Sequence, residues 1–357
     1  MEGWEAKHDG EKIDLAFIVD CTGSMGSYIK QVQKHVHFIA ETISRTAFNV
    51  RLGLIEYRDH PPQDKSFVTR VHDFTENVGE MKKWVDGMSA GGGGDWPEAV
   101  ADGLYEASRL SYRKQATKMC VLIADAPPHG LDQNGDGFPN GCPKGHDPLT
   151  LCRTLAEKGI TLYCIGCEPS VHTFRDFLMA LGAITGGQYV PLRQAKTLTK
   201  VITNAALEEV SLEKLMGAAS DFLHLTLLKN KAERKTMTVD ELADVLHKHL
   251  TLTNCQCQQV RINEKALPPL TNDGEKYSAM DQMVKARDFY AERKGGRSSS
   301  HSHSDAQEIV DLMGRMTVSP EQSRKLTTKY IARNKVPVTH CEITNQVVVG
   351  LIPDTLN

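Results

Sequence analysis

The chain has 357 residues, of which 40% are hydrophobic and 24% are charged, and its formal net charge is −3. This length suggests about two or three domains, and the composition is that of an ordinary globular protein with a core large enough to fold without disulfides. A charge this close to neutral argues against a general nucleic-acid or membrane-surface binder.

No targeting or membrane-spanning segment is expected. The first twenty residues carry charges throughout and lack the apolar run of a secretory signal. No other apolar run approaches the roughly 20 residues that a membrane-spanning helix needs. The nine cysteines are odd in number and irregularly spaced, which favours free thiols in a reducing compartment and a cytoplasmic protein.

Strands and helices alternate from residue 10 to residue 217. Apolar runs at 13–20, 118–125 and 160–167 have the pattern of strands buried on both faces of a parallel sheet. Further strands are expected at 49–58, 67–74 and 188–191, and helices at 24–44, 76–89, 97–112, 148–158, 171–185 and 196–216. The alternation predicts an α/β fold, a doubly wound, mostly parallel sheet with helices on both faces.

The rest of the chain is predicted to form a C-terminal, mainly helical extension. Residues 218–294 are expected to be a mixed α/β extension of unassigned fold, with helices at 219–229 and 239–250 and a strand at 256–263. Residues 295–304 have the composition of a flexible linker. Residues 305–357 are expected to be a mainly helical segment, with helices at 305–316 and 319–333, and 346–352 could form a terminal strand.

Oxygen-bearing side chains gather where the predicted strands end. Asp20, Thr22 and Ser24 follow the first strand with a spacing that lets them face one point, and Asp125 ends the strand at 118–125. Asp95 follows the glycine run 91–94, at the start of a helix. Ligands of open α/β sheets bind at the carboxyl ends of the strands, next to a switch in strand order, so these side chains are expected to converge.

A divalent cation explains why so many acidic groups would share one place. Carboxylates packed together repel one another unless a cation lies between them. Carboxylate and hydroxyl oxygens select Mg²⁺, with Mn²⁺ or Ca²⁺ as alternatives, over zinc. Mg²⁺ takes about six ligands and retains water, so one position can stay open for an Asp or Glu of a protein partner.

The segments DCTGS at 20–24, GGGGD at 91–95 and the strand-end Asp125 resemble the metal-ion-dependent adhesion site of von Willebrand factor type A domains. The resemblance covers residues 10–217 and implies a Rossmann-like fold and a Mg²⁺-dependent protein-binding module that is not an enzyme. Thr22 stands where the family usually has Ser, and Asp95 where it usually has Thr. GGGGDWPEA and ADAPPHG are most similar to the A domains of alpha-kinases and hemicentin-type proteins.

Other interpretations remain open. Thr22 and Ser24 could merely cap the first long helix, and Asp95 could cap the helix at 97–112. A strand-end Asp20 followed by TGS is also similar to a Mg²⁺-dependent phosphohydrolase, although Thr22 occupies the place of its acid–base carboxylate. No catalytic kinase domain is evident, so a third possibility is a non-catalytic regulatory relative of an alpha-kinase.

Several further motifs carry weaker signals. Asp132, Asn134 and Asp136 resemble the first half of an EF-hand loop, but Pro143 replaces its final Glu, and a polar insertion that lines the binding face is the alternative. The pairs Cys164/Cys167 and Cys255/Cys257 are expected to be buried thiols. No role is assigned to a set of acidic and histidine residues: Asp14, Glu56, Asp59, His60, His129 and His146.

Overall fold

The computed structural model describes residues 12–45, 48–192, 195–233, 235–262, 265–266, 270–296, 310–341 and 346–349. The predicted linker 295–304 lies outside this part of the chain, except for residues 295 and 296, which end helix α9 (Met283–Gly296).

A six-stranded sheet with the order β3-β2-β1-β4-β5-β6 forms the first part of the protein. All neighbouring strands are parallel except β3, which runs antiparallel at the edge. The strands are β1 (Lys12–Asp20), β2 (Asn49–Tyr57), β3 (Thr69–Thr75), β4 (Thr117–Ala124), β5 (Ile160–Cys167) and β6 (Tyr189–Leu192). The doubly wound, mostly parallel sheet predicted from the sequence is therefore confirmed, and the strand order switches direction between β1 and β4.

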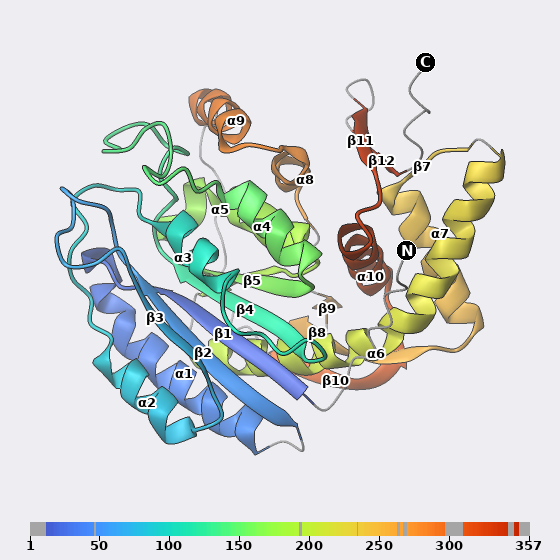
Figure 1. Ribbon diagram of the computed structural model, residues 1–357, viewed down its shortest axis with the longest axis horizontal. Helices are drawn as coiled ribbons and strands as arrows, with labels where there is room; N and C mark the ends of the chain where they lie inside the picture. The colour runs from blue at the N-terminus through green and yellow to red at the C-terminus, as the bar shows by residue number, and fades with distance from the viewer. Residues whose placement is uncertain are drawn as a thin grey trace.

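Helices cover both faces of this sheet (Figure 1). Alternate residues of β1 point to opposite faces, so that Phe17 joins the core beneath one set of helices and Ile18 the core beneath the other. The first set is α1 (Ile29–Ser44), α2 (Val78–Gly87) and the start of α6 (Ala195–Glu233). The second set is α3 (Val100–Ala107), α4 (Pro148–Glu157) and α5 (Arg175–Ile184). Short 3₁₀ turns precede α1 (Gly23–Ser27) and α5 (Ser170–Thr173).

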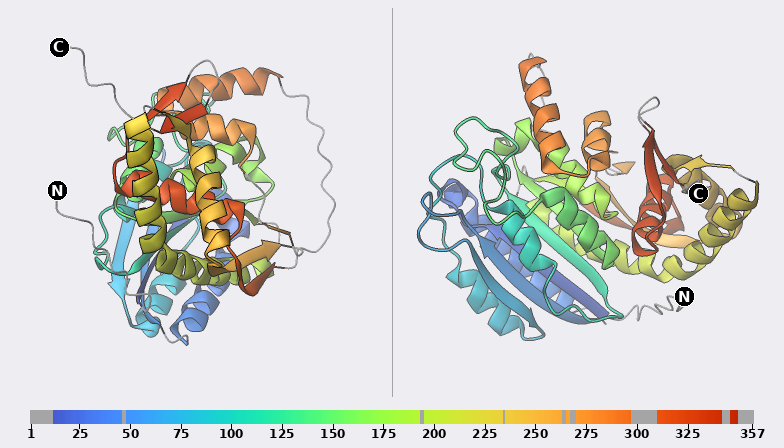
Figure 2. Two further views of the ribbon diagram at one scale, coloured as in Figure 1. Left: turned by 90° about the vertical axis from the view of Figure 1, so that its right-hand side faces the viewer. Right: turned by 45° about the horizontal axis from the view of Figure 1, so that its top comes forward.

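Much of the C-terminal part of the chain packs against α6, which is 39 residues long and can be followed into the C-terminal region in Figure 2. Its helices are α7 (Val239–Leu252), α8 (Asn272–Ala279), α9 and α10 (Pro320–Arg333). Its short strands are β7 (Met237–Thr238), β8 (Gln256–Ile262), β9 (Lys265–Ala266), β10 (Val310–Thr317), β11 (Val338–Cys341) and β12 (Gln346–Val349). A third core cluster lies between α6, α7 and α10.

Two features fasten the C-terminal part to the sheet domain. Helices α8 and α9 extend the core cluster around α4 and α5 with Tyr277 and Tyr290 (Figure 1). Helix α10 aligns three cations along three buried glutamates of α6. These ion pairs are Lys325–Glu208, Lys329–Glu209, Lys329–Glu213 and Arg333–Glu213.

Four of the expected helices are wrong in type or in extent. The segment expected as a helix at 305–316 forms strand β10 at 310–317, which pairs antiparallel with β8. The helices expected at 196–216 and 219–229 are one continuous helix, α6, which passes through residue 217. The helix expected at 97–112 is shorter and begins at Val100, after Pro97.

Candidate metal centre

The candidate metal centre lies at the carboxyl ends of β1 and β4, on either side of the switch in strand order. Asp20 is the last residue of β1, and Asp125 directly follows β4. Parallel pairing of the two strands brings their ends to one edge of the sheet. Both carboxylates are buried, at 0% and 1% exposure.

Four of the predicted ligands form one continuous row of contacts. The Thr22 hydroxyl donates to Asp20 Oδ1 at 2.6 Å, and the Thr22 backbone N–H donates to the same oxygen at 2.9 Å. The Thr22 and Ser24 hydroxyl oxygens are 3.1 Å apart, and the Ser24 hydroxyl donates to Asp125 Oδ1 at 2.9 Å. The spacing of alternate residues after β1 therefore places these oxygens together, as expected from the sequence.

The helix-capping alternative finds no support in these contacts. Helix α1 begins after Tyr28, and the 3₁₀ turn that follows Thr22 has no side-chain cap. Helix α3 is preceded by Ala99 rather than Asp95. The hydroxyls of Thr22 and Ser24 are instead directed to the two carboxylates.

The glycine run 91–94 lies beside this row of side chains. Its backbone packs directly against neighbouring side chains. Gly23 N–H donates to Gly92 O at 3.0 Å, which ties the run to the loop after β1. Gly92 and Gly93 have φ values of 74° and 76°, a region that favours glycine. A Cβ on Gly92 would lie 1.6 Å from Asp64 Oδ2, and one on Gly93 would lie 2.7 Å from Glu98 Oε1.

Asp95, the fifth predicted ligand, contacts a different group of residues. Its Oδ2 atom accepts a hydrogen bond from Gly137 N–H, and its carboxylate adjoins that of Asp59. His129 bridges two further carboxylates of this group, with Nε2 2.7 Å from Asp59 Oδ1 and Nδ1 2.8 Å from Asp136 Oδ1. Asp95 thus joins the loop after β4 to the glycine run.

Glu98 is an acidic neighbour that the sequence did not single out. It is 3% exposed, lies beside Gly93, and interacts electrostatically with both Asp20 and Asp125. Its place just before α3 gives no periodic or spacing signal. The turn of the glycine run and a backbone hydrogen bond from Glu98 N–H to Pro127 O, after β4, bring it to the site.

The electrostatics of the group favour a bound cation. Burial, with repulsion from Asp125, raises the pKa of Asp20 to about 7, against the hydrogen bonds from Thr22. Burial also raises the pKa of Asp125, and burial with nearby carboxylates raises the pKa of Glu98 to about 10. The buried Asp20 Oδ2 and Glu98 Oε2 atoms form no hydrogen bond of normal geometry, although the Tyr57 hydroxyl near Asp20 acts against the rise of its pKa. Two such carboxylate oxygens, surrounded by other oxygen ligands, could coordinate a divalent cation such as Mg²⁺.

The weaker motifs do not form sites of their own. Asp132 Oδ2 faces α9, where Tyr290 and Lys294 bind it, whereas Asp136 holds His129, so the EF-hand-like residues do not converge. Cys164 and Cys167 belong to the cores on opposite faces of the sheet. Eight cysteines of the described residues are free thiols.

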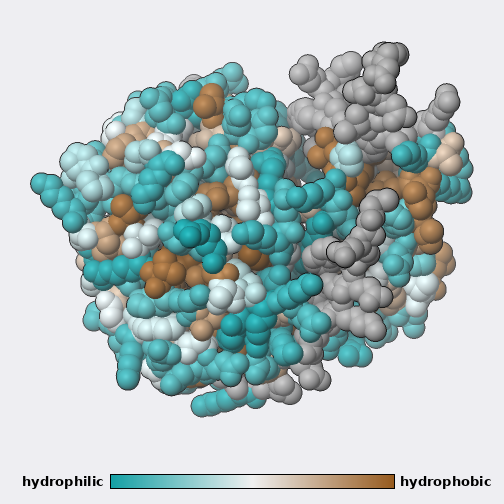
Figure 3. Space-filling model, viewed as in Figure 1, coloured by the Kyte–Doolittle hydropathy of each residue, from teal (hydrophilic) through white to brown (hydrophobic). Residues whose placement is uncertain are grey.

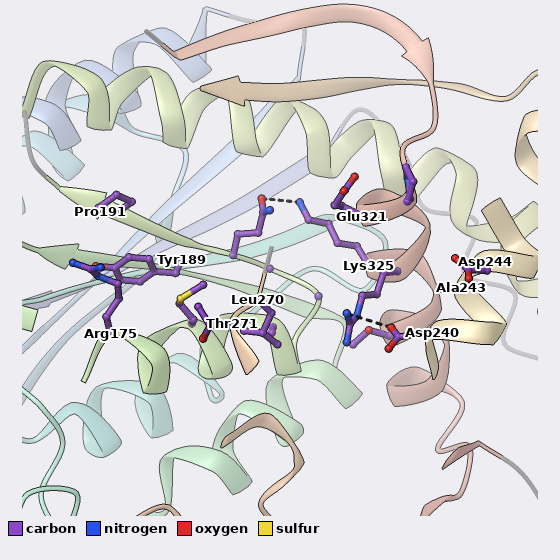
Figure 4. A pocket seen from close by; sticks show the side chains of 18 residues that line it. Arg175, Tyr189, Pro191, Asp240, Ala243, Asp244, Leu270, Thr271, Glu321 and Lys325 are labelled. Atoms are coloured by element: carbon purple, nitrogen blue, oxygen red, sulfur yellow. Dashed lines mark hydrogen bonds and ion pairs between the residues drawn. The ribbon is translucent and has the colours of Figure 1, made fainter. Parts of the chain in front are cut away.

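A cavity of about 560 Å³ lies between the β6 edge of the sheet domain and the C-terminal helices. In Figure 4, Arg175 and Tyr189 lie on one side of it and Asp240 and Lys325 on the other. None of the residues that line it belongs to the candidate metal centre.

Hydrophilic residues cover most of the face shown in Figure 3. Among the described residues, no helix combines the length and apolarity needed to cross a bilayer.

Comparison with known proteins identifies the class of this domain. The family model for the von Willebrand factor type A domain matches residues 14–204. The chain therefore belongs to this family, whose domains typically bind other proteins and are typically not catalytic.

The relatives of the chain have different overall functions. A putative ariadne-like RING finger protein of Acanthamoeba polyphaga mimivirus is 31% identical over 216 residues, which are 59% of this chain and 21% of that protein. The alpha-protein kinase vwkA of Dictyostelium discoideum is 33% identical, over 45% of this chain and 26% of the kinase. Subunit 25 of the Mediator of RNA polymerase II transcription from Xenopus laevis is 26% identical, over 48% of this chain and 24% of the subunit. The chain thus matches about a quarter or less of the length of each relative.

Proposed function

We propose that the protein is a non-catalytic binding module in which a divalent cation, Mg²⁺ in the first instance, links the domain to an acidic side chain of a protein partner. Asp20, Thr22, Ser24 and Asp125 would hold the ion, with Glu98 beside it and Asp95 supporting the glycine run. The ion would supply a positive charge at an otherwise acidic edge. Charges around the rim would then determine which partner binds.

One observation carries this proposal. Four oxygen-bearing side chains from two strand ends form a contact row, and the buried Asp20 Oδ2 atom within it forms no hydrogen bond of normal geometry, although the Tyr57 hydroxyl interacts with the Asp20 carboxylate. A buried, unpaired carboxylate oxygen costs free energy unless another group compensates it, and a cation does so. The sequence around these residues also resembles the adhesion-site motif of the family to which the chain belongs.

The cellular setting of the proposal follows from the chemistry of the cysteines. Free, mostly buried thiols fit a reducing compartment, and we place the protein in the cytoplasm. The similarity to a Mediator subunit is equally compatible with the nucleus. The partner would be a protein with an exposed Asp or Glu rather than a nucleic acid.

The two other candidate functions, a phosphohydrolase and a regulatory relative of an alpha-kinase, predict different experimental results. A phosphohydrolase would need a proton donor near Asp20, but Thr22 occupies that place and donates its hydroxyl to Asp20 Oδ1. A regulatory relative of an alpha-kinase fits the similarity to vwkA. Turnover of a phosphate ester that is lost in Asp20→Asn would favour the first, and binding to an alpha-kinase catalytic domain would favour the second.

The test is calorimetric titration of metal-stripped full-length protein with Mg²⁺. We expect saturable binding that is lost in Asp20→Ala, because this substitution removes the buried carboxylate at one end of the row. Asp221→Ala is the matched control, since it removes an exposed carboxylate on α6 and should bind Mg²⁺ as the unaltered chain does. Equal binding by Asp20→Ala and the unaltered chain would exclude the proposed site.

A further inference from the structure

A second cluster of metal-ligand side chains lies at the base of the loop between β4 and α4, drawn in green at the upper left of Figure 1. His60 follows β2, Asp102 lies in the first turn of α3, and Cys142 comes from the loop itself. Their side chains are almost entirely buried, with relative exposures of 4% for His60, 2% for Asp102 and 9% for Cys142. His146, from the same loop, reaches the cluster at 17% exposure.

The potential ligand atoms of His60, Asp102 and Cys142 all lie within 4.8 Å of one another. His60 Nε2 lies 2.8 Å from Asp102 Oδ2, and Cys142 Sγ lies 3.2 Å from the same oxygen and 3.6 Å from His60 Nε2. His146 Nδ1 is 3.4 Å from Asp102 Oδ1 and forms no hydrogen bond. Bonds of about 2.0–2.3 Å to a tetrahedral zinc place its ligands about 3.3–3.8 Å apart, so the His60–Asp102 contact need widen by only roughly half an ångström.

The arrangement is not that of a nucleophile with its base. A Cys–His–Asp triad needs the sulfur on one ring nitrogen of the histidine and the carboxylate on the other. Here Cys142 and Asp102 both face Nε2 of His60. Burial, with the nearby Asp102 charge, also raises the pKa of the Cys142 thiol to about 11, which is the opposite of activation. Atoms that converge on one point suit coordination of an ion instead.

Groups around the cluster would stabilise a Cys142 thiolate and an Asp102 carboxylate. Lys144 N–H donates to Cys142 Sγ at 3.4 Å, a contact that a thiolate would accept more strongly than a thiol. The Lys144 side chain lies 2.9 Å from Asp102 Oδ1, which leaves Oδ2 for an ion. The ring of His146 stacks on Tyr105 at 4.0 Å, which fixes its orientation beside the cluster.

We propose that His60, Asp102 and Cys142 hold a structural Zn²⁺ ion, separate from the oxygen site at Asp20, and that His146, beside Asp102 but outside this group, turns toward the ion as the fourth ligand. One thiolate, two imidazoles and one carboxylate are a ligand set typical of zinc, whereas Mg²⁺ prefers oxygen alone. The ion would fasten the loop to β2 and α3. It would thereby hold His129 and Gly137, the loop residues that bind Asp59 and Asp95 next to the oxygen site.

The test begins with the full chain purified without chelator. We expect about one Zn²⁺ per chain by elemental mass spectrometry. After replacement of the metal by Co²⁺, we expect a thiolate-to-cobalt charge-transfer band in the near ultraviolet and the intense visible bands of a tetrahedral ion. A chain that carries no zinc and gives no charge-transfer band with added Co²⁺ would overturn the proposal.

Variants separate this site from the other candidates. Cys142→Ser should lose the charge-transfer band, whereas Cys255→Ser, which alters a half-buried thiol elsewhere, should keep it. Asp20→Ala should also keep it, so that failure of the oxygen site and failure of the zinc site give different results. His146→Ala, at the rim of the cluster, should fold even if Cys142→Ser does not, and should bind zinc about tenfold or more weakly. Retention of the band in Cys142→Ser, or unchanged zinc affinity in His146→Ala, would contradict the assignment.

Discussion

At the scale of single residues, the candidate metal centre depends on glycines as much as on its acidic side chains. Gly92 lies against Asp64, whose carboxylate also accepts hydrogen bonds from the backbone and hydroxyl of Ser66. Its φ of 74° is strained for any residue with a Cβ. The glycine run therefore lets the backbone pass where no larger residue fits.

We expect Gly92→Ala to lower the free energy of unfolding by about 2 kcal/mol or more, since the new Cβ would be both strained and in collision with Asp64. It should also weaken Mg²⁺ binding by displacing the loop that covers Thr22. Urea denaturation and calorimetric titration measure the two effects.

Gly217→Ala is the matched control for this change. Gly217 lies in the middle of α6 with nothing within 4 Å of an added Cβ. The same substitution should there stabilise the protein, by up to about 1 kcal/mol, because alanine favours the helix. An unchanged stability of Gly92→Ala would show that the glycine run is not under the constraint described.

Four of the five residues predicted as ligands lie side by side in the structure, and the exceptions have a physical cause. Asp20, Thr22, Ser24 and Asp125 could be placed together because each follows a parallel strand whose end is fixed by the sheet. Asp95 was expected among the ligands and Glu98 was not considered, because the left-handed turns at Gly92 and Gly93 redirect the chain between these residues and β1. No periodicity in a sequence encodes such a turn.

At the scale of elements, the same contrast separates the sheet domain from the C-terminal part. Strands such as β5 were predicted from apolar runs that are buried on both faces, and the bounds of β5, 160–167, match those observed. The segment 305–316 was expected to be a helix, but residues 310–317 form strand β10. Its pairing with β8, which includes an irregularity between Met313 and Met316, decides its structure instead.

Helix α10 provides a prediction at this scale. Lys329 is 2% exposed and pairs with two buried glutamates of α6, Glu209 and Glu213. Lys329→Ala would leave buried negative charge without its partner, and we expect a loss of about 3–5 kcal/mol in the free energy of unfolding. Denaturant unfolding of the full chain measures it.

Lys335→Ala is the comparison for this substitution. Lys335 pairs with Glu157 at 3.2 Å, but its side chain is 75% exposed. Removing it should change the stability by less than about 1 kcal/mol. Equal effects of the two substitutions would mean that the α6–α10 ion pairs contribute no more than a surface contact.

At the scale of the whole molecule, the C-terminal part completes the sheet domain rather than following it as a separate unit. Helix α6 crosses the domain boundary expected at residue 217 without a break, and α10 neutralises glutamates that lie on the N-terminal side of that boundary. Asp132, in the loop beside the proposed zinc site, is held by Tyr290 and Lys294 of α9. Contacts across the boundary therefore reach the core clusters on both faces of the sheet and the loop next to the metal centre.

We expect the full chain to unfold in a single calorimetric transition, and a chain ending at residue 217 to unfold at least about 10 °C lower. The shortened chain would retain Glu208, Glu209 and Glu213 without the cations of α10, and would expose the apolar surface that α8 and α9 cover. A chain ending at residue 349 keeps every described contact and should melt with the full chain. Two separate transitions, or a 1–217 chain as stable as the whole, would show instead that the sheet domain folds without its extension.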